Sequence, residues 1–528
     1  MRVSALIGAM CMVMLVCPSW RARAQESPQD YRTQAQKLLA EGNYHQARQA
    51  AEAALRLEPH SAEAENLAGT AAFALGDLPA AESHLRRALE LQPDLVASHR
   101  ALAATYLGEK KVKDARFEFL AVLATEPHDF ICLYSLGRTF LEEQPAEALK
   151  QFERASQVKP HDPTLLAGEL EAHLRLNQEA EAQAVLADLD LQLNEGDARR
   201  EQIAALLVSH GAYPLAAHEF ELLHKAQPDS YQVNYNLALS YHRAGREEDA
   251  ARQLHSLLVN QKNAELEDLL GEVELSRGQA SEALAAYRRA VELEPRNEDY
   301  RYDYAQALVH QWELNQALQA FSEATKDFPR SARMRLGLGA TYYLAGKYPE
   351  AAQTLLKAGE IAPDRSEVYY LLGRDYDAAG PLQGAIEQEF LGYLSAKPQD
   401  AWAEYFYGRI LSVSSSNASL ERLRKAQEHL EKAVAVNGKL AEAHTELGDV
   451  FERLGQLETA RKELERAVQL DPQSSAAFYK LAQVYRRLGE IEKAQQATQR
   501  FQQLKTQQRA DLDREQIQSF LERAKQNK

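Results

Sequence analysis

Two short motifs in the chain begin like catalytic or cofactor-binding sequences, and each fails at a residue that its chemistry requires. His218-Glu219 begins like the zinc-protease motif H-E-x-x-H, but Leu222 occupies the place of the second zinc ligand. Gly337 and Gly339 begin like a dinucleotide-binding loop whose third glycine is missing. The fifteen histidines are scattered along the chain and form no ligand-spaced cluster with cysteine. The sequence therefore predicts neither an enzyme nor a metal or cofactor site.

Three pairs of tyrosine and arginine indicate chemistry of another kind, namely binding. The strings YSLGR, YLLGR and YFYGR each place an arginine four residues after a tyrosine. Residues four apart share one face of a helix, so each pair presents an aromatic ring beside a guanidinium. Such a face suits an extended peptide, because the ring offers apolar area and the arginine binds carboxylates. The pairs are Tyr134/Arg138, Tyr370/Arg374 and Tyr405/Arg409.

Regularly spaced prolines mark the elements that position these pairs. Pro59, Pro93 and Pro127 follow one another at intervals of 34 residues. Other intervals are close to one period or to two, such as the 68 residues between Pro160 and Pro228. A constant period of this length is the signature of a repeat architecture, in which each repeat is one supersecondary unit.

The pattern between the prolines resembles the tetratricopeptide repeat, whose 34-residue unit is a pair of antiparallel helices. We number the residues of each repeat so that the proline is at position 32. Position 8 is then a small residue in most repeats and position 24 is mostly a large apolar one, which indicates that the two helices approach closely. A frequent glycine at position 15 takes the positive φ that ends the first helix. These turn glycines are Gly42, Gly76, Gly211, Gly245, Gly278, Gly346, Gly380, Gly455 and Gly489. Position 20 is alanine in every repeat: Ala47, Ala81, Ala115, Ala148, Ala182, Ala216, Ala250, Ala283, Ala317, Ala351, Ala385, Ala426, Ala460 and Ala494.

The resemblance implies an all-α fold, a right-handed superhelical α-solenoid of tandem helix-turn-helix repeats. We expect about fourteen repeats within residues 25–508 and a capping helix over 509–528, which would cover the end of the stack. Whether 163–196 is a regular repeat stays open, because it lacks both the proline and the turn glycine, and 401–440 carries a serine-rich insertion. The predicted repeats are 28–61, 62–95, 96–129, 130–162, 163–196, 197–230, 231–263, 264–297, 298–331, 332–365, 366–400, 401–440, 441–474 and 475–508.

In the family the first helix of each repeat lines the concave face, so the resemblance implies that residues of these helices bind the partner. Tyrosine occupies position 5 of the first helix in six repeats. The alternative is that the tyrosines only pack against the neighbouring repeat and that the arginines flank them for solubility. The predicted partner-binding residues are Tyr134, Arg138, Tyr235, Tyr302, Tyr370, Arg374, Tyr405, Arg409 and Tyr479.

The first 24 residues have the layout of a secretory signal peptide. After a cationic start, residues 3–16 contain no charge, and Ala22-Arg23-Ala24 places small residues where signal peptidase reads them. A run of 14 residues is shorter than the roughly 20 that span a bilayer, so we expect cleavage between Ala24 and Gln25 rather than a membrane anchor. The mature protein is therefore expected to be exported, to the periplasm or outside the cell, without a transmembrane segment.

The balance of charged residues bears on which class of partner the chain can bind. The chain has 61 Lys and Arg against 77 Asp and Glu, a net charge of −16, and loss of Arg2, Arg21 and Arg23 with the signal peptide makes it −19. This balance argues against nucleic acid as a partner, because phosphate binding needs an excess of cations. Of the three cysteines only Cys132 would remain after the signal peptide is removed, and its apolar neighbours indicate a buried thiol.

Two classes of function stay open at this point. The first is a protein-interaction scaffold that binds partner peptides or proteins. The second is a carbohydrate-associated scaffold of an exopolysaccharide export or assembly system, in which the tyrosines would stack on sugar rings. The sequence identifies no partner and predicts no cofactor for either.

Overall fold

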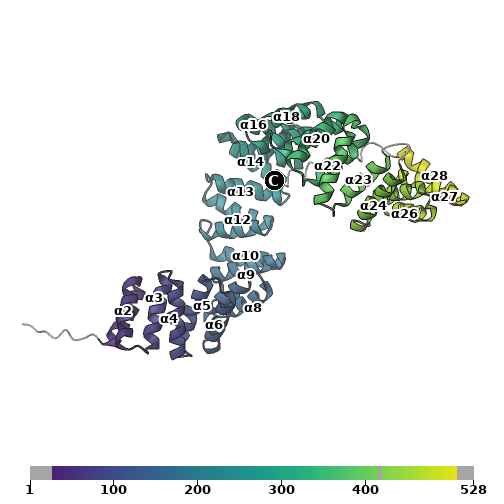
Figure 1. Ribbon diagram of the computed structural model, residues 1–528. Helices are drawn as coiled ribbons and strands as arrows, with labels where there is room; N and C mark the ends of the chain where they lie inside the picture. Colours follow the sequence, from purple (N-terminus) through teal and green to yellow (C-terminus); the bar gives the residue numbers. More distant parts are fainter. Residues whose placement is uncertain (1–26, 414–418, 508–528) are drawn as a thin grey trace, which may run out of the picture. The chain divides into compact units, whose positions relative to one another are not determined.

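The computed structural model describes residues 27–413 and 419–507, and in this part of the chain all regular secondary structure is helical (Figure 1). The all-α fold predicted from the sequence is thus confirmed. The predicted signal peptide with Ala24 and Gln25, most of the serine-rich insertion and the predicted capping helix over 509–528 lie outside the described residues. Among the residues that are described, no helix is both long enough and apolar enough to cross a membrane.

The chain divides into two compact parts, an N-terminal part of residues 1–244 and a C-terminal part of residues 245–528. In the N-terminal part consecutive helices pack against each other except at α10 and α11, and first helices of successive pairs, such as α1 and α3, are also in contact. The helices are α1 (Pro28–Ala40), α2 (Tyr44–Leu57), α3 (Ala62–Ala74), α4 (Leu78–Leu91), α5 (Val96–Gly108), α6 (Val112–Thr125), α7 (Phe130–Phe140), α8 (Pro145–Ser156), α9 (Pro163–Arg175), α10 (Glu179–Gln192), α11 (Arg199–Ser209), α12 (Tyr213–Ala226) and α13 (Tyr231–Arg243).

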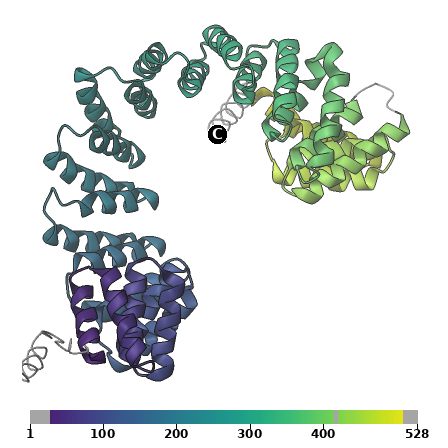
Figure 2. The same ribbon diagram turned by 60° about the vertical axis from the view of Figure 1, so that its left-hand side comes forward.

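The C-terminal part repeats this arrangement of side-by-side helix pairs (Figure 2). One connection differs from the others, because two short 3-10 helices, η1 (Tyr376–Ala378) and η2 (Gly380–Leu382), join α21 to α22. The α-helices are α14 (Glu247–Asn260), α15 (Ala264–Ser276), α16 (Ala280–Leu293), α17 (Glu298–His310), α18 (Leu314–Asp327), α19 (Ala332–Leu344), α20 (Tyr348–Ile361), α21 (Ser366–Asp375), α22 (Gln383–Ala396), α23 (Ala401–Val413), α24 (Leu420–Val436), α25 (Ala441–Arg453), α26 (Leu457–Leu470), α27 (Ser475–Leu488) and α28 (Ile491–Gln507).

The turn between the two helices of a pair has the left-handed backbone that the sequence pattern predicts. All nine predicted turn glycines have positive φ, from +58° at Gly380 to +81° at Gly489. Asn177 takes the same conformation, with φ +54°, in one of the predicted repeats that lack the glycine, and Lys110 and Trp312 do so in two others, with φ +61° and +62°. Asparagine tolerates this region better than most residues, so the turn is kept without glycine.

The core of each pair is built from the small and large residues that the repeat pattern places opposite each other. Thirteen of the fourteen predicted alanines are buried, all with at most 2% of their surface exposed. A Cβ atom added at Gly271 of α15 would lie 2.7 Å from the ring of Tyr287 in α16, so only glycine fits there. The close approach of paired helices is therefore confirmed.

Ala385 is the exception, and the prediction that it packs between helices is wrong. Ala385 is exposed, whereas the next residue, Ile386, is completely buried. The cause is the connection through η1 and η2, which starts α22 at Gln383 and rotates its buried face by one residue. Phe390, four residues after Ile386, is also completely buried and fills the place of the large apolar residue.

Candidate functional site

The six tyrosines that the sequence predicts at the binding face differ in exposure. Tyr134, Tyr235 and Tyr405 are half-buried, and Tyr479 is 46% exposed. In contrast, Tyr302 and Tyr370 have only 0% and 5% of their surface exposed. Their rings pack in the core, so the expectation that these two tyrosines face a ligand does not agree with the structure.

In the C-terminal part the two predicted pairs belong to one aromatic cluster. The ring of Tyr370 lies 5.2 Å from that of Trp402, which in turn lies 5.8 Å from that of Tyr405. Arg409 forms an ion pair with Asp377, and its Nη1 atom donates a hydrogen bond of 3.3 Å to the carbonyl of Gly373. Arg409 therefore links α23 to α21, a structural contact that the sequence did not indicate.

Arg374 of α21 also has contacts inside this cluster. Its guanidinium carbon lies 5.9 Å from the centre of the Tyr370 ring, and its Nη1 atom donates a hydrogen bond of 3.3 Å to the Tyr370 hydroxyl. The cluster thus combines two arginines with aromatic rings, but most of its ring surface is used for packing.

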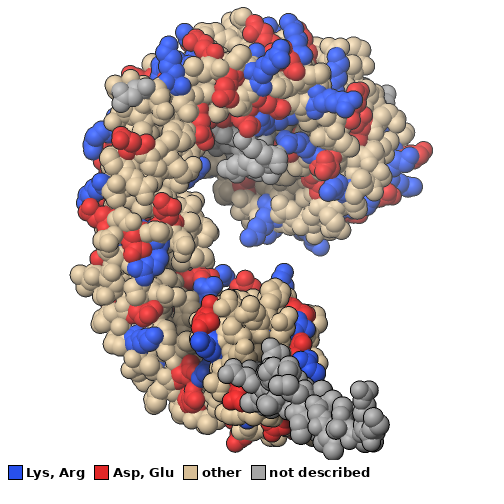
Figure 3. Space-filling model, turned by 90° about the vertical axis from the view of Figure 1, so that its left-hand side faces the viewer, with Lys and Arg blue, Asp and Glu red and all other residues tan. Residues whose placement is uncertain are grey.

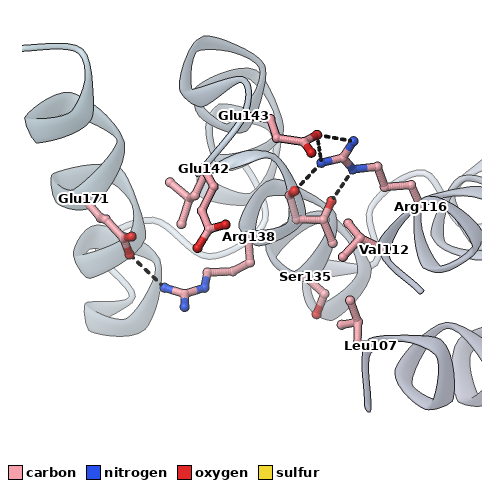
Figure 4. A pocket seen from close by; sticks show the side chains of 10 residues that line it. Leu107, Val112, Arg116, Ser135, Arg138, Glu142, Glu143 and Glu171 are labelled. Atoms are coloured by element: carbon pink, nitrogen blue, oxygen red, sulfur yellow. Dashed lines mark hydrogen bonds and ion pairs between the residues drawn. The ribbon is translucent and has the colours of Figure 1, made fainter. Parts of the chain in front are cut away.

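In the N-terminal part, Arg138 lies at a pocket of about 490 Å³ (Figure 4). We call this hollow the Arg138 pocket. Its walls come from α5, α6, α7 and α9 and from the turn after α7, so three successive helix pairs contribute to it. The side chains that line it include Leu107, Val112, Arg116, Arg138, Glu142 and Glu171.

The tyrosine and arginine of the Tyr134/Arg138 pair have separate roles at this pocket. Tyr134 lies against Phe130 and Phe152, at ring-centre distances of 6.3 and 5.9 Å, and burial raises the pKa of its hydroxyl. Arg138 follows one helical turn later, and half of its side chain is exposed. Its Nη1 atom lies 3.1 Å from Oε2 of Glu171. Tyr134 therefore fixes α7 against α8, and Arg138 is accessible.

Arg116 lines the same pocket, but its guanidinium is bound to residues at the end of α7. Its Nε atom donates a hydrogen bond of 3.1 Å to the hydroxyl of Thr139, and its guanidinium also binds the Thr139 carbonyl. The guanidinium carbon lies 4.1 Å from the centre of the Phe140 ring. Carbonyls at the end of a helix have no partner within the helix, so Arg116 supplies the missing donor there. Its charge is consequently not available to a ligand.

The charged groups that a ligand can reach in the Arg138 pocket are of both signs, and the cation, Arg138, is already in contact with Glu171. Arg138 provides one exposed guanidinium, and Glu142 is an exposed carboxylate that forms no ion pair among the described residues. Leu107 and Val112 add exposed apolar surface. The pocket can therefore bind a polar segment that carries an acceptor for Arg138 and a donor for Glu142.

The sequence analysis named Arg138 but not Glu171, which contacts it from the next repeat. The two residues are 33 positions apart, which is one period of the pattern. Pairs of opposite charge one period apart would have indicated such a contact, because equivalent residues of successive first helices lie side by side.

A second group of residues that the sequence analysis missed is a polar pair within a helix hairpin. In each case a histidine or arginine early in the first helix binds a glutamate 19 residues later, in the second helix, and also the carbonyl six residues earlier. The constant spacing of 19 was the available signal. These pairs are His99/Glu118, Arg200/Glu219 and His444/Glu463.

Glu219 of the Arg200/Glu219 pair belongs to the incomplete zinc-protease motif. His218 lies 2.8 Å from Asp190, and Asp190, His218 and Glu219 are close enough together to hold a metal ion. However, Nη1 of Arg200 lies 2.7 Å from Oδ1 of Asp190 and 2.9 Å from Oε2 of Glu219. The guanidinium therefore occupies the place where a cation would bind these carboxylates.

Cys132 of α7 is completely buried, as its apolar neighbours predict. Burial raises the pKa of its thiol to about 11. The thiol therefore stays protonated at neutral pH and packs as a small apolar group.

Charged side chains are mixed over the surface. On the face drawn in Figure 3, Lys and Arg are interspersed with Asp and Glu, and no broad cationic surface is visible among the described residues. Nucleic-acid backbones bind to clustered cations, so this face offers no such site.

Helix pairs that follow one another and contact mainly their neighbours define a helical-repeat solenoid, a class of proteins whose sites are surfaces formed by several repeats. Models of the tetratricopeptide repeat match residues 32–96, 202–263, 269–314 and 311–374, and two further models of this repeat match 453–489 and 476–504. The chain is a tetratricopeptide repeat (TPR) protein.

Two curated relatives are similar over short stretches. A TPR repeat-containing protein of Treponema pallidum (strain Nichols) is 29% identical over 29% of this chain and 17% of its own length. The TPR repeat-containing thioredoxin TTL4 of Arabidopsis thaliana is 34% identical over 19% of this chain and 15% of its own length. The chain thus matches less than a fifth of the length of either relative.

Solved structures of low identity match most of the chain. Yeast Tom70 is 17% identical over 94% of this chain and 95% of its own, with a TM-score of 0.34. A chain of the APC/C hetero-tetramer Cut9–Hcn1 is 16% identical over 87% of this chain and 90% of its own, with a TM-score of 0.33.

Proposed function

We propose that this chain is an exported, non-catalytic scaffold that binds segments of partner proteins on the face formed by the first helices of its repeats. The observation that carries the proposal is the Arg138 pocket. It lies in a helical-repeat solenoid, it is formed by three successive helix pairs, and it keeps half of the Arg138 side chain exposed. A site of this kind binds an extended segment rather than a compact substrate, because its contacts are distributed along the stack.

The chemistry of the pocket indicates what the bound segment carries. A carboxylate of the partner, from a side chain or a chain end, can bind Arg138 next to Glu171 through a charge-assisted hydrogen bond. A donor on the same segment can bind Glu142, and an apolar side chain can contact Leu107 and Val112. A purely acidic segment is disfavoured, since Glu142, Glu143 and Glu171 all line the pocket.

The experiment is affinity capture from an envelope extract by the chain without residues 1–24, compared with two variants. Arg138→Ala removes the exposed guanidinium, and we expect a captured partner to bind roughly tenfold more weakly to it. Arg175→Ala is the matched control, because Arg175 also forms an ion pair with Glu171, at 3.0 Å, but does not line the pocket. A partner that binds both variants as tightly as the unaltered chain would contradict the assignment of the pocket.

The carbohydrate-associated alternative predicts a different outcome of a related experiment. Polysaccharide would then shift the tyrosine fluorescence, chiefly that of Tyr479, the most exposed of the predicted tyrosines, and Arg138→Ala would have no effect on that shift. A protein partner that depends on Arg138 favours the interaction scaffold instead.

A further inference from the structure

A second hollow of the N-terminal part lies between α4, α5 and α6 and has a volume of about 540 Å³. We call it the α4–α6 groove. Its apolar side is formed by Leu102, Tyr106 and Phe117, and the acids Glu82, Glu90 and Asp114 lie on its rim. The Arg138 pocket shares none of these residues.

The apolar side of the groove contains a large side chain that the fold does not use. Leu102 and Tyr106 form the floor and are 1% and 8% exposed, whereas Phe117 is 68% exposed. Helix α6 buries its opposite face, with Ala115 and Phe119 nearly inaccessible to solvent. Phe117 therefore offers its ring to the groove without contributing to the packing of α6.

The cations at the groove are already neutralised by the protein itself. Lys111 lies 2.7 Å from Oε2 of Glu82 and 2.8 Å from Oε2 of Glu109, and Arg86 lies 3.4 Å from Oε1 of Glu82, so two carboxylates balance the two cations. Glu90 forms an ion pair of 2.7 Å with Arg87. Asp114, in contrast, is exposed and forms no hydrogen bond or ion pair through its side chain within the described part of the chain. The rim consequently has a solvent-exposed carboxylate without an ion-pair partner among the described residues, one helical turn before Phe117.

We propose that the α4–α6 groove binds a segment of a partner protein in which a large apolar side chain is flanked by lysine or arginine. The apolar side chain packs against Phe117, Leu102 and Tyr106, and the cation pairs with Asp114. This inference rests on the proposed function, since it treats the chain as a protein-binding scaffold. It adds a second binding site that prefers a partner of the opposite charge. The Arg138 pocket offers a guanidinium to a partner's carboxylate, whereas the groove offers a carboxylate to a partner's cation. An acidic segment would be repelled here.

The test uses a random peptide library displayed on phage and selected on the chain without residues 1–24. Enriched peptides are synthesised with a fluorescent label, and their affinity is measured by anisotropy. We expect an enriched sequence with an aromatic or aliphatic residue next to lysine or arginine. Phe117→Ser should weaken its binding by roughly tenfold or more, as expected for a central apolar contact. Asp114→Asn should weaken binding less and reduce its dependence on salt.

Two control variants make the result specific to the groove. Leu120→Ser changes another exposed apolar residue of α6, 52% exposed, that does not line the groove, and it should leave binding unchanged. Arg138→Ala should also leave it unchanged. Equal binding to Phe117→Ser and the unaltered chain, enrichment of acidic peptides, or no enrichment at all would overturn the proposal. Peptides that respond to Arg138→Ala alone would overturn it and leave the proposed function in place.

Discussion

The Nη1 atom of Arg200 in α11 lies 2.9 Å from Oε2 of Glu219 in α12, and the two side chains are 2% and 0% exposed. The same guanidinium donates hydrogen bonds of 2.8 Å to the carbonyls of Leu193 and Asn194, in the turn after α10. One buried arginine thus joins both helices of a hairpin to the preceding connection. Burying two charges costs much free energy, which their mutual attraction offsets. Replacement of one of the two residues therefore leaves the other charge buried without a partner.

Arg200→Ala should therefore lower the local free energy of unfolding by about 3–5 kcal/mol, because Glu219 stays buried and unpaired. Hydrogen exchange of peptides from α10 to α12 measures this, since repeat arrays open locally rather than as one unit. The double variant Arg200→Met, Glu219→Leu removes both charges and should recover most of the stability. If the single and the double variant were equally protected from hydrogen exchange, the unpaired buried charge would not be the cause of the lost stability.

Gly271→Ala should destabilise the α15–α16 pair by about 1–3 kcal/mol, because the new methyl group would overlap the ring of Tyr287. Gly384→Ala in α22 is the matched control, since no atom lies within 4 Å of the added carbon. That change should be neutral or stabilising by up to about 1 kcal/mol, through helix propensity alone. Urea unfolding followed by circular dichroism compares the two variants, and similar midpoints would contradict the close approach of α15 and α16.

Asp375, the last residue of α21, predicts a pH dependence of the C-terminal part. Its carboxylate is 1% exposed, and both oxygens lack a side-chain hydrogen-bond partner among the described residues. Desolvation raises its pKa from 3.8 to about 7. The folded state then keeps a proton that the unfolded state releases, so this contribution to stability is complete below about pH 4 and is lost as the pH rises through 7.

Asp375→Asn should remove this dependence, so that the variant exceeds the unaltered chain in stability at pH 8 but not at pH 4. About 1.4 kcal/mol per pKa unit sets the upper limit of the difference. Hydrogen exchange of α21 and α22 peptides at both pH values measures it, with the exposed residue Asp364 changed to Asn as the control. A parallel pH profile for all three proteins would mean that Asp375 is ionised in the folded chain at neutral pH.

Export remains a prediction from the sequence, and it has a direct measurement. The intact mass of the protein from its native source should correspond to a chain that begins at Gln25, because signal peptidase reads the small residues Ala22 and Ala24. A mass that retains Met1, or a lipid on Cys17, would contradict the predicted cleavage and the net charge of −19.

Much of the fold follows from the sequence because its signals are local and repeated. Proline spacing, the turn glycines and the buried alanines each depend on backbone conformation or on contact within one hairpin, and the same requirement recurs along the chain. Even Asn177 could be assigned to the turn, since it stands where nine other repeats have glycine. The error at Ala385 arose where a changed connection length rotated α22 by one residue, which the pattern in that helix alone does not reveal.

The sequence by itself therefore determined the helical repeats, the turns and which face of most helices is buried, because a period of 34 residues records a contact that every repeat must make. Only the tertiary structure decided which predicted binding residues are accessible. Tyr302 and Tyr479 occupy the same position of equivalent first helices, yet one is completely buried and the other is 46% exposed. The reason is that exposure depends on neighbours one repeat away, such as Arg333 over the Tyr302 ring and Glu171 beside Arg138, and these partners vary from repeat to repeat.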